Sequence, residues 1–308
     1  WYFLDNPYSE FYSAAYRDNF QEVVDRSETD NQLAISPRLG ISHPVTSVSK
    51  LYFNYGHFYS VPRANERFRL YHGGQASRLN FLGNPNLEMP RTVAYELGYE
   101  QQVLEQYLVH ISGYYKNVTN QIADVEFSDY DNSVDYTTTT NNNYADIRGF
   151  EIRLEKQAGR WFTGWANYNF MVRTSGYVGR QHYYQDQRLQ RLQGLQNPYQ
   201  EKPLARPYAR ANLQFHTPVE WGPEVLGSQL LGGWNFSFLY KYQAGQHFTW
   251  DPLDTNELQD NVQWAPYHNW DLRVTKNIQA GPANLRLFAD VQNLFNQKNL
   301  SRVAYGEG

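Results

Sequence analysis

The dominant pattern along this chain is an alternation of apolar and polar residues with a period of two, which is the period of a β-strand. In the clearest segment, 231–243, the rings of Trp234, Phe236 and Phe238 occupy alternate positions. Ten strands are predicted in this way, at 33–42, 50–60, 91–101, 105–118, 144–156, 161–173, 207–217, 231–243, 267–278 and 284–293. Segment 185–196 has leucines at helix-like spacing, and we interpret it as at most a surface turn of helix.

The predicted strands are long, and the connections between them alternate in length. Strands of about 9–11 residues or more are long enough to cross a bilayer when tilted, whereas globular strands average about 5–6. The long connections are expected near 61–90, 119–143, 174–206 and 244–266, and the short ones near 43–49, 102–104, 157–160 and 279–283, with one of middle length near 218–230. Long loops at one end and short turns at the other are typical of an outer-membrane barrel.

Charged residues in the middle of the strands indicate which face meets water. The residues predicted to face a polar lumen are Arg38, Glu96, His110, Glu151, Arg153, Arg210, Arg273, Arg286 and Asp290. Either face could be the inside on this pattern alone. The apolar rows are single stripes rather than a packed core, and aromatic residues such as Tyr52, Tyr107 and Trp270 gather toward strand ends like an interfacial girdle. Both features favour a membrane barrel with an apolar outside.

Composition narrows the class of protein further. Aromatic residues make up 17% of the 308 residues, which is not the composition of a disordered chain. The net charge of −4 offers no basic field for a nucleic acid, so no nucleic-acid partner is expected. The chain has no cysteine, which excludes disulfides and thiolate metal sites. No apolar run reaches the roughly 20 residues that a transmembrane helix needs.

No motif in the chain predicts catalysis, a cofactor or a metal ion. The eight histidines lack metal-ligand spacing, and no nucleophile elbow or phosphate-binding loop occurs. Mid-strand carboxylates could suggest hydrolysis, but a charge-lined lumen with cross-strand ion pairs is the preferred interpretation. The acidic connection 119–143 could offer oxygen ligands to Ca²⁺, yet its spacing fits no calcium loop, so we favour a solvated acidic loop. We therefore expect that the chain is not an enzyme.

Aromatic and polar side chains in the long connections are candidates for binding a solute. Rings beside polar groups suit sugars, peptides or flat chelates, although an aromatic girdle would need no ligand. The ligand-binding residues predicted for these extracellular loops are Tyr183, Tyr184, Arg180, Trp250, Tyr130 and Tyr136.

Four segments in order carry a resemblance to a known family. They are SPRLGISHPVTSVSKLYFNYGHFYSVP (36–62), GNPNLEMPRTVAYELGYEQ (83–101), YADIRGFEIRLEKQAGRWFTGWANYNFM (144–171) and LFADVQNLFNQKNL (287–300). Together they resemble the TonB-dependent receptors of Gram-negative outer membranes, and most of all the group that carries an N-terminal carboxypeptidase-regulatory-like domain.

The resemblance implies an all-β, antiparallel outer-membrane barrel that imports a bulky solute past a plug. Such a receptor has about 22 strands, so residues 1–308 are expected to be a partial barrel domain from which the plug and the N-terminal strands are absent. Long loops would be extracellular and short turns periplasmic. The implied partners are outer-membrane lipid, the inner-membrane TonB energy complex acting through the absent N-terminal segment, and a surface lipoprotein or another envelope subunit.

Three other interpretations stay open at this point. The chain could be a closed barrel of ten strands. It could be a structural or scaffolding barrel subunit of a larger envelope complex. A secreted all-β carbohydrate-active protein would also be rich in aromatic residues, but its long loops would have no reason to gather at one end.

Overall fold

The computed structural model describes residues 5–13, 28–73, 78–196, 200–201, 204–225, 228–250, 261–280 and 283–299. Its long strands are β1 (Arg38–Thr46), β2 (Ser49–Tyr59), β5 (Arg91–Val103), β6 (Tyr107–Ser128), β7 (Asp135–Lys156), β8 (Phe162–Tyr177), β11 (Tyr208–His216), β14 (Trp234–Gln243), β17 (Tyr267–Ala280) and β18 (Ala283–Val291). The shorter elements are η1 (Glu10–Tyr12), α2 (Ala64–Phe68), β3 (Leu70–Gly73), β4 (Arg78–Leu82), β9 (His182–Tyr184), α3 (Gln187–Gln196), β10 (Gln200–Glu201), β12 (Glu224–Val225), β13 (Ser228–Gln229), β15 (His247–Phe248) and β16 (Val262–Gln263).

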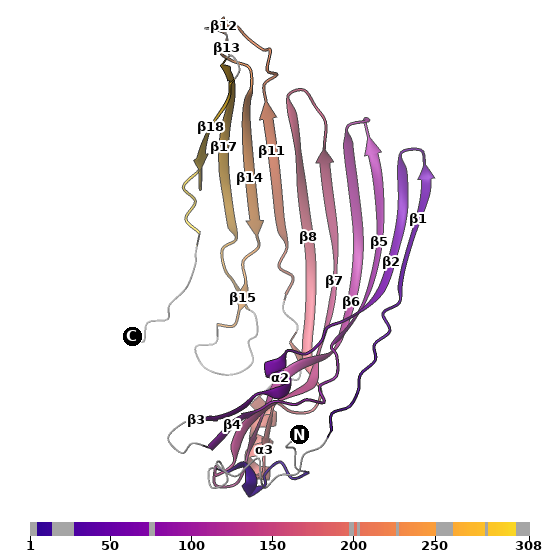
Figure 1. Cartoon of the computed structure of the whole chain (residues 1–308), viewed down its shortest axis with the longest axis vertical. Coiled ribbons are helices and arrows are strands. Elements are labelled where there is room, and N and C mark those ends of the chain that lie inside the picture. The colour runs from indigo at the N-terminus through magenta and orange to yellow at the C-terminus, as the bar shows by residue number, and fades with distance from the viewer. Residues whose placement is uncertain are drawn as a thin grey trace.

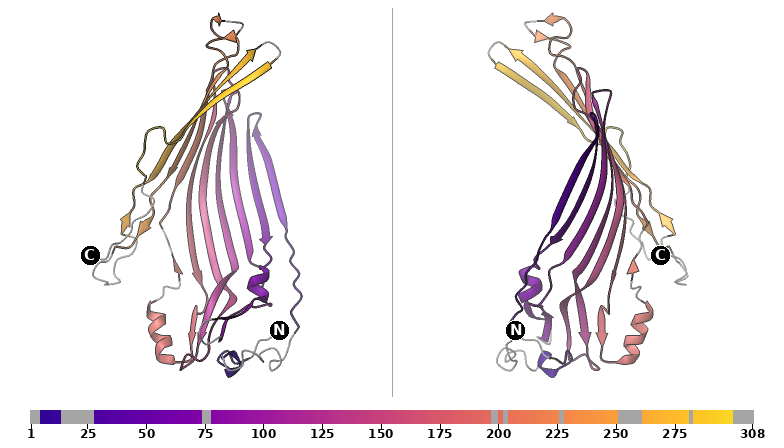
Figure 2. Two further views of the ribbon diagram at one scale, coloured as in Figure 1. Left: turned by 60° about the vertical axis from the view of Figure 1, so that its left-hand side comes forward. Right: turned by 90° about the vertical axis from the view of Figure 1, so that its right-hand side faces the viewer.

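The long strands form one twisted sheet in which each strand pairs with the next one along the chain (Figure 1). The order is β1-β2-β5-β6-β7-β8-β11-β14-β17-β18, and every pairing along it is antiparallel. The ten predicted strands and the antiparallel all-β class are therefore confirmed. Figure 2 shows that the sheet is curved and open. Within the described residues, β1 pairs only with β2 and β18 only with β17, so the sheet has two free edges.

The first strand, predicted at 33–42, begins at Arg38 and continues to Thr46, through part of the connection predicted at 43–49. The larger differences from the prediction are in β6 and β7. These strands are 22 residues long, so most of the connection predicted at 119–143 is a continued hairpin with a turn near 129–134. The polar run of threonines and asparagines in β7 stays in the ladder, with Asp124 opposite Thr139 and Glu126 opposite Thr137. Threonine is β-branched and favours extended backbone, which explains why this polar segment pairs.

The segment predicted as at most a turn of helix is a ten-residue helix, α3. The Asp186 carboxylate accepts a hydrogen bond from the backbone N–H of Arg188 at 2.7 Å, which is the contact of an N-cap. The helix therefore begins where an acidic side chain satisfies a free N–H group. Among the described residues, no helix is long and apolar enough to span a membrane.

At one end of the sheet, several connections fold together into a compact unit that we call the loop lobe (Figure 1). It comprises residues 5–13, 61–73, 78–90, 119–143 and 178–196. Two short strands hold it to the main hairpin by parallel pairing, β4 to β7 and β9 to β6. Its buried core consists of Tyr12, Leu79, Leu82, Val134 and Tyr136. The long connections therefore form a packed unit with its own hydrophobic core.

The core of the loop lobe predicts a strong effect of removing the Tyr136 ring. Tyr136 is 1% exposed and lies 4.8 Å from Tyr12 between ring centroids. In Tyr136→Ala, the lost burial and the cavity should cost about 3–5 kcal/mol, the range for large aromatic residues. Hydrogen exchange of the backbone amides of β4 and β9 should become much faster. Tyr130→Ala is the matched control, since that ring is 69% exposed. Equal exchange in both variants would contradict the packing role of Tyr136.

Candidate functional site

The strand register places all nine predicted lumen-facing residues on one face of the sheet, which we call the charged face. Residues directly opposite each other in neighbouring strands point to the same face, and the faces alternate along each strand. One row across eight strands consists of Lys50, Glu100, His110, Arg153, Asn167, Arg210, Lys241 and Asn269. Arg38, Glu96, Glu151, Arg273, Arg286 and Asp290 fall on this face by the same count.

The opposite face, which we call the apolar face, is rich in aliphatic and aromatic side chains and largely uncovered. A row across it runs Ile41, Phe53, Leu97, Gly113, Phe150 and Phe170. Leu97 is 53% exposed although it lies in the middle of a strand of the sheet. An apolar surface that spans a whole sheet needs an apolar environment to cover it.

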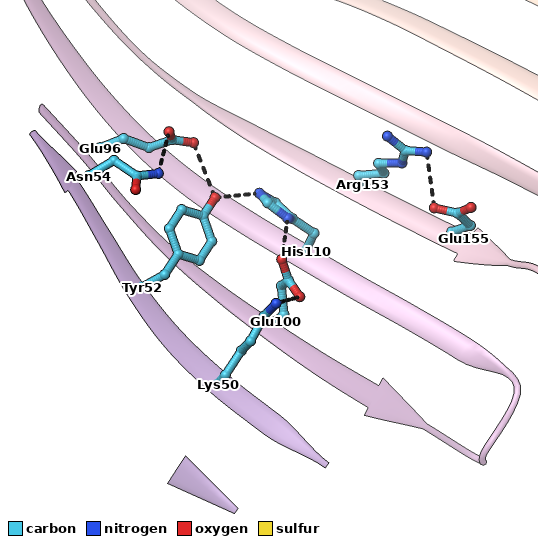
Figure 3. A network of polar contacts seen from close by, with 8 residues as sticks. All are labelled: Lys50, Tyr52, Asn54, Glu96, Glu100, His110, Arg153 and Glu155. Carbon is cyan, nitrogen blue, oxygen red and sulfur yellow. Dashed lines mark hydrogen bonds and ion pairs between the residues drawn. The ribbon is translucent and has the colours of Figure 1, made fainter. Parts of the chain in front are cut away.

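Polar contacts link neighbouring strands on the charged face (Figure 3). The Lys50 ammonium pairs with Glu100 at 2.8 Å, and Glu100 lies 3.5 Å from Nδ1 of His110. On its other side, Nε2 of His110 lies 2.9 Å from the hydroxyl of Tyr52, which donates to Glu96 at 3.1 Å. This network therefore joins β2, β5 and β6 through side chains as well as through the backbone.

A glycine makes room for the central tyrosine of this network. Gly98 lies directly opposite Tyr52 in the ladder, and a Cβ atom at Gly98 would collide with the Tyr52 ring. The ring therefore lies flat over the neighbouring strand, which brings its hydroxyl to Glu96 and His110. Any side chain at position 98 would push the ring away from both partners.

A hollow of about 1040 Å³ opens on the same face of the sheet. Its lining includes Arg38, Asn54, Glu96, Tyr114, Lys116 and Glu151. Glu151 accepts a hydrogen bond from Asn167 at 2.6 Å, and Tyr114 donates one to Asn169 at 3.4 Å. The hollow therefore has charged and polar groups, held by cross-strand contacts, within a wall that is otherwise mostly apolar.

Ion pairs also occur toward the far edge of the charged face. Arg273 donates two hydrogen bonds to the carboxylate of Asp290, at 2.6 and 2.8 Å, from directly opposite positions in β17 and β18. Arg286 donates to Asn277 at 3.0 Å in the same strand pair. Because the Arg273–Asp290 pair is solvent-exposed, its contribution to stability is small.

The loop lobe brings together most of the predicted ligand-binding residues. The Tyr183 ring stacks on Phe127 at 4.9 Å between centroids, and Phe127 in turn stacks on Tyr136. The Tyr184 backbone N–H donates to Gln190, and Tyr130 donates in the same way to Gln185. The carbonyl of Arg180 accepts from Asn142 at 3.3 Å. The lobe thus holds a stack of rings that ends at the half-buried Tyr183.

Two of the six predicted ligand-binding residues, Tyr136 and Trp250, do not share a surface with the other four. Tyr136 is enclosed in the core, where burial raises the pKa of its hydroxyl and the nearby Tyr12 adds to that effect. Its ring therefore offers no surface to a solute in this structure. Trp250 lies in the connection between β14 and β17, where its backbone exchanges hydrogen bonds with Asn261 at 2.7 and 3.0 Å.

The sequence pattern did not single out several residues that build the lobe. His182 pairs with Glu126 at 2.9 Å across the parallel contact of β9 with β6. Tyr12 and Phe127 complete the stack of rings from segments far apart in the chain. Within the part of the chain that the structure describes, no group of three or more acidic or histidine residues is arranged to hold a metal ion.

These two faces define the class of the protein. A curved antiparallel sheet of long strands, polar on one face and apolar and exposed on the other, is the wall of a membrane-spanning β-barrel. The long connections gather at one end and the short turns at the other, as that class requires.

Comparison with known proteins gives the family. The model of the family described as "TonB dependent receptor-like, beta-barrel" matches residues 8–294. The chain belongs to this family, which places it in the bacterial outer membrane, in contact with outer-membrane lipid. A comparison with curated proteins finds no match.

Two solved structures show the same fold. The outer membrane transporter YddB from Escherichia coli aligns with a TM-score of 0.55 at 13% identity, over 86% of this chain and 37% of that one. The FrpB iron transporter from Neisseria meningitidis (F3-3 variant) aligns with a TM-score of 0.51 at 13% identity, over 85% of this chain and 35% of that one. The chain therefore spans little more than a third of the length of these transporters.

The polar network predicts that the Tyr52 hydroxyl stabilises the wall. Tyr52→Phe leaves the ring over Gly98 but removes the group between His110 and Glu96, and it should lower the free energy of unfolding by about 1–2 kcal/mol. Urea unfolding of the protein from lipid vesicles measures this loss. Tyr95→Phe, on the apolar face of the neighbouring strand, is the matched control. A loss in Tyr95→Phe as large as that in Tyr52→Phe would contradict the role of the network.

Proposed function

We propose that this chain is part of the barrel wall of an importer, which moves a bulky solute across the outer membrane through a plugged lumen. The observation that carries the proposal is the separation of the two faces. The nine residues predicted to face a lumen, eight charged ones and His110, lie on one face, and large apolar side chains are exposed on the other. In this role the charged face lines the lumen and the apolar face meets lipid. No covalent chemistry is part of the mechanism.

The two free edges support the proposal that further strands complete the barrel. A strand edge in lipid would leave its backbone N–H and C=O groups without partners, and each such group costs several kcal/mol. Strands beyond β1 and β18, up to about 22 in all, would satisfy those groups and enclose a lumen wide enough for a plug. The hollow of the charged face would then hold part of that plug by polar contacts.

The loop lobe is proposed to face the outside and to bind the solute first. The candidates that remain at or near its surface are Tyr130, Arg180, Tyr183 and Tyr184, with Trp250 on a separate connection. A ring backed by a buried stack, as Tyr183 is by Phe127, is a preformed platform that loses little freedom on binding. The short turns would face the periplasm, where the TonB energy complex acts on a plug.

The orientation of the faces can be tested with single cysteines, because this chain has none of its own. Glu96→Cys and Arg153→Cys place a thiol on the charged face, while Leu97→Cys and Ile152→Cys place one on the apolar face. We expect a water-soluble maleimide to label the first pair in outer membranes and to leave the second pair unlabelled, since a thiolate does not form in hydrocarbon. All four thiols should react once the protein is unfolded. Faster labelling of Leu97→Cys than of Glu96→Cys would overturn the assignment.

Import itself can be tested by following what cells remove from their medium. Cells with and without the protein receive a mixture of siderophores, cobalamin, oligosaccharides and peptides. We expect the uptake of one class to stop without the protein, and also when the proton gradient across the inner membrane is collapsed. Unchanged uptake of every class, together with the loss of a co-purifying envelope complex, would support a scaffolding barrel and contradict import.

A further inference from the structure

The connection between β11 and β14 is unlike the other turns at its end of the sheet. We call its described residues, 217–225 and 228–233, the flap. It contains its own small hairpin, β12 paired with β13, which lies at the tip of the molecule in Figure 1. Its base continues the ladder, with Thr217 and Trp234 joined by a backbone hydrogen bond of 2.9 Å. The flap is therefore an ordered extension of the sheet.

A lysine on the apolar face holds the flap in place. Lys276 lies opposite Trp234 in the register, on the same face as Phe236 and Phe238. Its side chain is 7% exposed, and its ammonium group donates to the carbonyl oxygens of Gln229 at 2.7 Å, of Leu230 at 3.2 Å and of Gly232. The indole N–H of Trp234 also donates to the Leu230 carbonyl, at 3.1 Å. Both contacts attach the flap on the apolar side of the sheet.

The outer surface of the flap is apolar. The side chains of Val219, Trp221, Leu230 and Leu231 are exposed there, and Trp161 from the β7–β8 connection joins them by an edge-to-face contact with Trp221 at 5.2 Å. Charged groups lie beside this patch, with the guanidinium of Arg160 over the Trp161 ring at 5.9 Å. Exposed Glu220 and Glu224 belong to the same connection.

We propose that the flap is a membrane-binding element that lies in the headgroup region of the lipid leaflet at the short-turn end. Lipid is the occupant because the flap is attached to Lys276 and Trp234 of the apolar face, whose partner is already the bilayer. Tryptophan beside arginine at the edge of an apolar surface is the composition of a membrane interface. Lys276 holds the flap to the sheet, since its ammonium donates to three carbonyl oxygens of the flap.

The depth of the flap can be measured with nitroxide spin labels on the intact protein. Leu231→Cys and Trp221→Cys carry the label in the flap, Leu97→Cys carries it on the apolar face, and Glu105→Cys carries it in a different turn at the same end. In vesicles of phosphatidylethanolamine and phosphatidylglycerol, the ratio of oxygen to nickel-complex accessibility should be several-fold higher for the flap labels than for Glu105→Cys. It should stay below the value for Leu97→Cys, which lies deeper in the bilayer.

This role of Lys276 is tested by adding Lys276→Met to the labelled Leu231→Cys protein. We expect the label to become more mobile and its accessibility ratio to fall toward that of Glu105→Cys, while the β-sheet circular dichroism stays unchanged. An unchanged ratio would overturn the role of Lys276. Flap labels as open to nickel as Glu105→Cys would overturn the membrane contact, and labels shielded from both reagents would overturn it in favour of a protein partner. None of these outcomes depends on whether the protein transports a solute.

Discussion

The structure depends above all on the need to pair every backbone N–H and C=O group where water is absent. A sheet that crosses a bilayer meets this need only through an unbroken ladder between neighbouring strands. The ladder here runs without interruption from β1 to β18, each strand paired to the one before it in the chain. That arrangement lets neighbouring segments of chain form hairpins, and all the connections at one end except the flap are short. It also leaves the two outermost strands as the places where the wall must continue.

The same ladder decides the chemistry of both surfaces at once. Because side chains alternate strictly across a strand, one register sends Glu100, His110 and Arg153 to one face and Tyr99, Ile111 and Ile152 to the other. A slip of one residue in any pair would send charges into lipid. The side chain of Tyr52 also favours this register. Its ring lies over Gly98 and its hydroxyl contacts Glu96 and His110, and these contacts form only when positions 52 and 98 are opposite each other.

Sequence alone predicted the strands well wherever lipid and water lie on opposite sides, because that contrast produces the alternation. It failed in β6 and β7 beyond about residue 119, where the hairpin leaves the wall and enters the loop lobe. There Thr138 and Thr139, which are adjacent in sequence, are both buried by protein, so apolar and polar residues no longer alternate with a period of two. The sequence did not predict the core of the loop lobe either, because Tyr12 and Tyr136 come into contact only when the connections fold together. Tyr136 was therefore predicted to be a surface ring that binds a solute. The nine residues predicted to face the lumen could be assigned to one face because they follow the period of two.

The need to pair backbone groups also accounts for Lys276, which is buried on the apolar face. Where the chain leaves β11 to form the flap, the carbonyl groups of residues 229, 230 and 232 no longer belong to the ladder of the main sheet. They need donors from elsewhere, and here a side chain of the main sheet supplies them. Lys276 provides three N–H groups on a long apolar stem, which matches three carbonyl oxygens without exposing the charge. A lysine at this position of the apolar face thus follows from the same need to pair backbone groups that shapes the ladder.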